Sequence, residues 1–203
     1  MVGGRGTRGG ATQGLQHRFG DPGPTTTVAL VEVRAVTPEE YRAAGEVVVA
    51  AYRALPGAST TSGYEEALAD VADRARTAVV LVAVDPVVSG APEDATRVLG
   101  CVTFVEGRGS LWAEQLEEGE ASIRMLGVDP AAQGRGVGAA LLDHCIRRAR
   151  ESGARALFLH STPWMKAAHH LYAKAGFVRV PERDWEPTPE VPLLAFRLDL
   201  ACA

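Results

Sequence analysis

The sequence lacks long hydrophobic runs and a basic excess, and each lack argues against a class of protein. No apolar run in the 203 residues approaches the roughly 18 residues that a membrane-spanning helix needs, and the first residues lack the hydrophobic region of a signal peptide. We therefore expect a cytoplasmic protein without a membrane partner. The 21 Lys and Arg against 25 Asp and Glu give a net charge of −4, which argues against nucleic acid as a partner, because nucleic-acid binding usually requires a basic surface.

Metal-ligating patterns are also lacking. The three cysteines are Cys101, Cys145 and Cys202. Their number is odd, they have no metal-ligand spacing and their neighbours are apolar, so we expect small buried residues or a free thiol and no disulfide. The histidines considered as ligands are His144, His160, His169 and His170. Adjacent histidines point to different faces of a helix, and no carboxylate pattern accompanies them, so we expect no metal site.

The residues that are present suit one compact domain. A chain of this length with 46% hydrophobic residues can bury a substantial core as a single domain. Residues 1–27 are rich in Gly, Thr and Arg without periodicity, which predicts a disordered N-terminal tail. We expect residues 28–203 to form the domain.

The apolar pattern predicts an α/β fold with a sheet of mixed direction. Runs rich in β-branched residues, bounded by Gly and Pro, predict strands at 30–36, 78–84, 97–105, 121–128, 155–161, 177–180 and 193–200. Helical spacing of apolar residues predicts helices at 37–53, 64–75, 136–152 and 164–174. The second and third of these strands flank a loop rich in Pro, Ser and Gly and should form an antiparallel hairpin.

A glycine-rich turn between a strand and a helix is the most informative feature of the chain. The segment 123–142 runs from an apolar strand through Gly134, Gly136 and Gly138 directly into a helix. Glycines allow positive φ and a close approach of the backbone to a ligand, while the free N–H groups of the first helical turn lie at the positive end of the helix dipole. The turn therefore predicts a cradle for a phosphate or pyrophosphate.

Two common phosphate-binding motifs fit this turn poorly. A P-loop requires a lysine followed by Ser or Thr after the glycines, and this chain has neither there. The spacing Gly134-x-Gly136-x-x-Ala139 matches the loose dinucleotide fingerprint, but that fingerprint also needs an acidic residue about 20 positions further on. The strand expected at 155–161 offers none.

The turn resembles the acetyl-coenzyme A signature of the GNAT family of N-acetyltransferases. Residues 133–138 read Gln-Gly-Arg-Gly-Val-Gly, which fits Gln or Arg, two residues, Gly, one residue, and Gly or Ala. The segment 125–130 precedes the turn as the family's central strand, and the segment 171–177 follows at the distance expected for the family. The resemblance is strongest over 120–180 and weaker over 30–200. It implies one GNAT-like domain with a mixed, mostly antiparallel sheet of six to seven strands, about four flanking helices, acetyl-CoA as co-substrate and no metal.

The resemblance also implies which residues hold the coenzyme. The residues expected at the pyrophosphate are Gln133, Gly134, Arg135, Gly136, Val137, Gly138 and Ala139. The central strand is expected to part from the strand at 155–161, often through a bulge, for which Gly127 is a plausible place. Backbone groups of Leu126, Gly127 and Val128 would then be free to bind the pantetheine amides and to stabilise the oxyanion. The alternative is a central strand that is fully paired.

Tyr172 is the candidate general acid, because similar enzymes place a tyrosine at this point before Gly-Phe. A phenol of pKa about 10 is protonated at neutral pH and can give the departing thiolate a proton or a hydrogen bond. The alternative is that its ring packs under the sheet and only anchors the coenzyme. One departure from the family is Met165, where an asparagine is common. Trp164 or the backbone of the first helical turn is expected to replace that polar contact.

Glu120 is the candidate general base, because the amine arrives largely as an ammonium and must lose a proton before it attacks. It stands at the start of the central strand, where the two-residue period of a strand places Ser122 and Arg124 on the same face. The alternative is a surface carboxylate in an acidic hairpin with Glu117 and Glu118.

The expected activity is transfer of an acetyl group from acetyl-CoA to an amine by direct attack in a ternary complex. Acceptor specificity should lie in the irregular segments 55–63 and 181–189, where Trp185 either closes over the substrate or pins its loop to the core. We expect a small-molecule or peptide amine as acceptor and a monomer or homodimer. The alternative function is a catalytically silent domain that binds or senses acyl-CoA.

Overall fold

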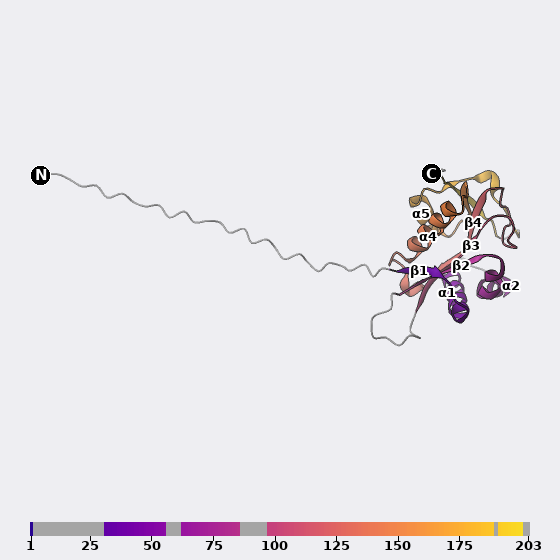
Figure 1. Cartoon of the computed structure of the whole chain (residues 1–203), viewed down its shortest axis with the longest axis horizontal. Coiled ribbons are helices and arrows are strands. Elements are labelled where there is room, and N and C mark those ends of the chain that lie inside the picture. The colour runs from indigo at the N-terminus through magenta and orange to yellow at the C-terminus, as the bar shows by residue number, and fades with distance from the viewer. Residues whose placement is uncertain (2–30, 56–61, 86–96, 189–190, 201–203) are drawn as a thin grey trace.

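The computed structural model describes Met1 and residues 31–55, 62–85, 97–188 and 191–200 (Figure 1). The expected tail at 1–27 and Cys202 lie outside the described residues. The strands are β1 (Glu32–Ala35), β2 (Val79–Val84), β3 (Val98–Val105), β4 (Glu120–Val128), β5 (Ala156–Ser161), β6 (Val178–Arg179) and β7 (Leu194–Asp199). The α-helices are α1 (Tyr41–Arg53), α2 (Ser62–Ala69), α3 (Val71–Thr77), α4 (Val137–Glu151) and α5 (Lys166–Lys174). Short 3-10 helices are η1 (Pro38–Glu40), η3 (Pro130–Ala132) and η4 (Pro181–Arg183).

The strands form one sheet in the order β1-β2-β3-β4-β5-β7-β6. All neighbours are antiparallel except β4 and β5, which are parallel. Helices α4 and α5 cover one face and α1 and α2 cover the other (Figure 1). The expected mixed, mostly antiparallel sheet is therefore confirmed. In the described part of the chain, no helix combines the length and apolarity that crossing a bilayer requires.

The helix expected at 64–75 is two helices, which is why the described chain has five α-helices and not four. The break falls at Asp70, whose carboxylate accepts a hydrogen bond from the Asp73 N–H at 2.9 Å and so caps α3. This cap satisfies a helix-start amide that has no partner within the helix, and the chain turns at that point. The helically spaced apolar residues from Tyr64 to Ala75 therefore lie on two consecutive helices, on either side of this turn.

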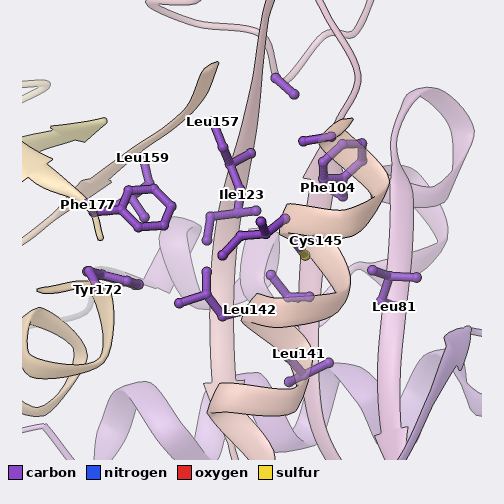
Figure 2. Close-up of a cluster of buried hydrophobic side chains, with 14 of the residues drawn as sticks. Leu81, Phe104, Ile123, Leu141, Leu142, Cys145, Leu157, Leu159, Tyr172 and Phe177 are labelled. Atoms are coloured by element: carbon purple, nitrogen blue, oxygen red, sulfur yellow. The ribbon is translucent and has the colours of Figure 1, made fainter. Parts of the chain in front are cut away.

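Two apolar clusters hold the layers together. Under α4, the side chains of Leu141, Leu142 and Cys145 pack on the sheet beside Ile123 and Leu157 (Figure 2). Under α1 and α3, a second cluster gathers Val48, Leu68, Val71, Val80, Val82, Cys101 and Met125. Cys101 and Cys145 are both free thiols buried in these clusters.

The central strands part soon after they begin. β4 pairs with β5 only over Glu120–Ser122, opposite Ala156–Phe158, and beyond these three pairs both strands continue unpaired with each other. The predicted parting of the strands is thus confirmed. The expected bulge is present but not at Gly127: the register with β3 shifts between Arg124 and Gly127, and Met125 has a φ of 52°.

Gly127 has a packing role instead. A Cβ atom at this position would lie 3.0 Å from the Val48 Cα and 3.2 Å from the Ala51 Cβ of α1. The missing side chain therefore lets α1 lie directly on β4. This contact holds α1, which carries Tyr52, against the edge where the strands part.

We predict that Gly127→Ala destabilises the protein by about 1–3 kcal/mol, because the added methyl group meets helix backbone that has no room to yield. Urea unfolding measures the loss. Gly63→Ala is the matched control, since a Cβ there has nothing within 4 Å and alanine favours the helix. Equal stabilities for wild type and Gly127→Ala would contradict the packing role.

Candidate active site

A cavity of about 390 Å³ opens where β4 and β5 diverge. Its walls come from α1, α2, β4, β5 and the segments on either side of α5. Its aromatic lining consists of Tyr52, Tyr64, Phe158, His160, Trp164 and Trp185. Leu55, Pro187 and Thr188 also line it, so both irregular segments expected to face the acceptor contribute described residues to this cavity.

The charged side chains in the cavity lining neutralise each other. Glu114 accepts hydrogen bonds from both Nη atoms of Arg124 at 3.1 Å. Arg124 also donates to the Trp112 carbonyl oxygen at 3.0 Å and lies over the Trp112 ring, 5.6 Å from its centroid. Among the described residues of the lining, no other Lys, Arg, Asp or Glu occurs. The cavity is thus apolar and aromatic, with one internally satisfied ion pair.

Two tyrosines that the sequence analysis did not single out stand at the helix side of the cavity. The rings of Tyr52 and Tyr64 meet edge to face with centroids 6.1 Å apart. Burial raises the pKa of Tyr52 well above its usual value, and the neighbouring hydroxyls of Tyr64 and Tyr172 raise it further. Tyr52 is therefore a neutral phenol at physiological pH.

The start of α4 has the geometry of an anion cradle. Gly134 and Gly136 have φ values of 78° and 82°, and an added Cβ at either would have nothing within 4 Å. No side chain caps the helix, and its first turn closes from the Ala140 N–H to the Gly136 oxygen. The amides of Val137, Gly138 and Ala139 consequently have no partner within the helix. Free amides at a helix N-terminus beside an open surface suit a diphosphate.

Gly138 differs from the expectation for the glycine-rich turn. It has no positive φ and belongs to α4. A Cβ there would lie 3.4 Å from the Leu171 Cδ2, so this glycine lets α5 approach α4. The side chain of Arg135 forms an ion pair with Asp85 at 2.6 Å, and Gln133 is exposed. The cradle therefore consists of backbone, with these two side chains at its rim.

The unpaired strand edges would suit a ligand with amide groups. Leu126 and Val128 lie on the part of β4 that has left β5. Beside the cavity, the buried Thr162 hydroxyl has no hydrogen-bond partner among the described residues. It stands close to Met165, the position where an asparagine was expected, whose sulfur accepts from the Ser161 hydroxyl at 3.4 Å. Thr162 thus offers a polar contact where Met165 does not.

Tyr172 lies on the opposite side of the sheet from the cavity. It is 6% exposed and lies beside Phe177 (Figure 2), and its ring centroid is 5.8 Å from those of both Phe177 and Phe196. Burial raises the pKa of Tyr172 above 10, and the nearby Cys145 thiol adds to this shift. The ring is thus anchored as in the packing alternative, while its hydroxyl stays protonated as the acid role requires. That role remains a prediction.

Glu120 is a buried ion-pair centre and does not line the cavity. Its carboxylate accepts from the Arg183 Nη1 at 2.9 and 3.0 Å, from the Arg197 Nε at 3.2 Å and from the Glu117 N–H at 3.1 Å. Burial alone would raise the pKa of Glu120, but these donors outweigh it and the pKa is lowered. It sits at the closed end of the parted strands, whereas Ser122 and Arg124 reach the cavity. The proposed base role remains a prediction that this geometry does not favour.

His160 is a cavity residue that the sequence analysis weighed only as a metal ligand. It follows Phe158 on the same face of β5, and their rings meet at 4.9 Å. Its Nε2 lies 2.9 Å from the Arg183 carbonyl oxygen. The two-residue period of β5 is the signal that could have placed it beside Phe158. Within the described residues, no group of three or more His, Cys, Asp or Glu is arranged to hold a metal ion.

Comparisons with known proteins agree with this geometry. The sequence profile of the acetyltransferase (GNAT) family matches residues 50–177. The probable glucosamine 6-phosphate N-acetyltransferase 2 of Oryza sativa subsp. japonica is 29% identical over 167 residues, which are 77% of this chain and 91% of that protein. A GNAT-family acetyltransferase from Staphylococcus aureus Mu50 has the same fold, with a TM-score of 0.65 at 12% identity over 84% of this chain and 99% of that chain. A putative acetyltransferase from Salmonella typhimurium, solved with its cofactor acetyl-CoA, has a TM-score of 0.56 at 21% identity. The match covers 84% of this chain and 94% of that chain.

We predict that Glu120→Gln destabilises the protein at pH 7 by about 3 kcal/mol, because it leaves Arg183 and Arg197 without their buried counter-charge. The folded-state pKa of Glu120 lies below the unfolded value. The ionised Glu120 carboxylate therefore stabilises the fold fully above about pH 4.3, the pKa of a glutamate in the unfolded chain. This stabilisation disappears as the pH falls through the lower pKa of the folded state. The difference in unfolding free energy between wild type and Glu120→Gln should therefore shrink over the same acidic range.

Urea unfolding from pH 7 to pH 3 measures this difference. Glu118→Gln is the control, because Glu118 is exposed on the same hairpin and its change should stay within about 0.5 kcal/mol. Equal free energies of unfolding for Glu120→Gln and wild type at pH 7 would contradict the ion-pair role. So would a difference between them that stays the same from pH 7 to pH 3.

Proposed function

The chain belongs to the GNAT acetyltransferase family, and from this premise we propose that it transfers the acetyl group of acetyl-CoA to a primary amine by direct attack within a ternary complex. The observation that carries the proposal is the junction at the parted strands. On one side the uncapped start of α4 offers free amides, and on the other side the aromatic cavity opens. A coenzyme and an acceptor bound at these two places would meet in the gap between β4 and β5.

Acetyl-CoA supplies an acetyl group activated as a thioester. The backbone at Gly134 to Ala139 would bind its diphosphate, and the free edge at Leu126 to Val128 would bind its amide-containing arm as an added strand does. The buried, unpartnered Thr162 hydroxyl stands ready to bind a polar group at the same junction. These features together fit a long ligand with a diphosphate at one end and amides in the middle.

Tyr172 would act on the leaving sulfur. Its pKa lies above 10 and that of a thiol lies near 8.5, so complete proton transfer to the thiolate is uphill by more than about 2 kcal/mol. We therefore assign Tyr172 chiefly the role of hydrogen-bond donor to the sulfur as the C–S bond breaks. Because the hydroxyl is buried, that hydrogen bond acts in a low-dielectric environment, where it stabilises developing negative charge most strongly.

The character of the cavity favours an amine with an apolar or aromatic body. Rings of Tyr52, Tyr64, Trp164 and Trp185 offer faces that stack on apolar groups and attract an ammonium. A phosphorylated acceptor would need unpaired cationic donors, and the one described Arg in the lining, Arg124, is already bound to Glu114. The acceptor thus differs in class from the phosphosugar in the name of the rice relative.

We predict that 2-phenylethylamine is acetylated with a kcat/KM at least 10-fold higher than that for glucosamine 6-phosphate. Stacking in the aromatic cavity favours 2-phenylethylamine, and the lack of a free cation among the described lining residues disfavours glucosamine 6-phosphate. Release of the coenzyme A thiol measures both rates, and glucosamine serves as the control that lacks only the phosphate. A preference for glucosamine 6-phosphate over glucosamine would reject this acceptor class while leaving the acetyltransferase activity in place.

We predict that Tyr172→Phe lowers kcat by about 10²- to 10⁴-fold, because the sulfur loses its donor. The ring contacts with Phe177 and Phe196 remain, so acetyl-CoA should still raise the Tm. Tyr41→Phe is the matched control on α1, outside the cavity. Unchanged turnover in Tyr172→Phe would reject the acid role. Tight acetyl-CoA binding with no thiol release from any amine by wild type would favour the alternative of a silent acyl-CoA-binding domain.

A further inference from the structure

We propose that His160 is the general base of the acetyl transfer, with its Nδ1 lone pair accepting the proton of the acceptor ammonium. The inference rests on the proposed function, since it assigns the proton acceptor for that reaction. His160 lies on β5 where the strands have parted, and it lines the aromatic cavity. No carboxylate in the described lining is free for this task, because Glu114 is bound to Arg124 and Glu120 lies outside the cavity.

The tautomer of His160 follows from one contact. Its Nε2 lies 2.9 Å from the Arg183 carbonyl oxygen, which can only accept a hydrogen bond. The proton of the neutral ring therefore resides on Nε2, and Nδ1 keeps its lone pair. Phe158 meets the ring edge to face at 4.9 Å and Trp185 stands 6.1 Å away, so the imidazole is held between a strand neighbour and the loop before β7.

The carbonyl group that holds His160 is itself fixed in place. The guanidinium of Arg183 donates two hydrogen bonds to the buried Glu120 and lies over the Phe158 ring, 3.8 Å from its centroid. Glu120 is thus a positioning residue: it fixes Arg183, whose backbone fixes the imidazole. This chain of contacts gives the buried carboxylate a part in the site without contact to substrate.

The surroundings of His160 keep it neutral. Burial lowers the pKa of His160 below 6.5, and the charges of Arg124 on β4 and Arg183 on η4 lower it further. The hydrogen bond to the Arg183 carbonyl and the charge of Asp184 act in the opposite direction and do not outweigh them. At pH 7 the ring is therefore mainly unprotonated and ready to accept a proton.

The acid and the base stand on opposite faces of the sheet, on either side of the gap. His160 takes one proton from the ammonium, and the freed nitrogen pair forms the new N–C bond to the acetyl carbon. The C–S bond breaks and its electron pair leaves with the sulfur, whose charge Tyr172 stabilises through a hydrogen bond. The nitrogen then loses its second proton, which balances the proton that the sulfur takes up to form the thiol. The products are the acetamide and the coenzyme thiol, and one proton passes from His160 to solvent.

The test is the pH dependence of kcat/KM for 2-phenylethylamine in wild type and in His160→Gln. Wild type should lose activity on acidification with a midpoint below about 6.5. His160→Gln should lower kcat/KM by about 10²- to 10⁴-fold at pH 7.5 and remove that acidic limb. Acetyl-CoA should still raise the Tm of the variant, because the coenzyme cradle is untouched. His144→Gln, a histidine change on α4 outside the cavity, should leave the profile unchanged.

An unchanged rate and acidic limb in His160→Gln would overturn the inference while the acetyltransferase function stands. If wild type acetylates none of 2-phenylethylamine, glucosamine and glucosamine 6-phosphate, although acetyl-CoA raises its Tm, the proposed function fails and the base role fails with it. A second measurement does not depend on the acceptor. Nitrogen NMR of the labelled imidazoles, assigned with His160→Gln, should show the Nε2–H tautomer of His160 at pH 7, and an Nδ1–H tautomer or an imidazolium would overturn the inference.

Discussion

The parting of β4 from β5 is the constraint on which the rest of the structure depends. Three residue pairs join the strands, and the cavity opens at the last of them, Ser122 with Phe158, and beyond it. The gap exposes strand edges to a ligand and opens the aromatic cavity on one face, while Tyr172 lies in the core cluster on the other. A fully paired sheet would separate the two faces. Parted strands make them two sides of a single site.

Two local arrangements hold the gap open at a fixed width. At its closed end, Glu120 ties β4 to Arg183 and Arg197, which come from the segment before β7 and from β7 itself. Along its open part, Gly127 brings α1 onto the face of β4, so that the helix packs against this strand beyond its last pair with β5. Both arrangements use rigid groups, a buried ion cluster and backbone packing, and the distance across the gap is therefore set before any ligand binds.

Features encoded by neighbouring residues could be predicted, and features that depend on distant pairing could not. The strands and the glycine-rich turn follow from segments that carry their own signal, whereas the parting of the strands was expected only from the resemblance to the GNAT family. The bulge at Met125 depends on the register with β3, which no local pattern of β4 reveals. The burial of Glu120 depends on arginines 63 and 77 residues away. The two-residue period of β5 could have placed His160 on the same face as Phe158. Its hydrogen bond to the Arg183 carbonyl, which links it to the site, could be seen only in the structure.

The short junction between β4 and β5 also has a mechanical meaning. Four strands, β1 to β4, form one half-sheet and β5, β7 and β6 form the other; three residue pairs join them directly, while the ion cluster at Glu120 and the core under α4 also span both halves. A ligand that pairs with the free edges would bridge the half-sheets where their strands do not pair with each other and would complete one continuous sheet. Loading the coenzyme and completing the sheet are then one event, and its departure after transfer leaves the strand edges unpaired again.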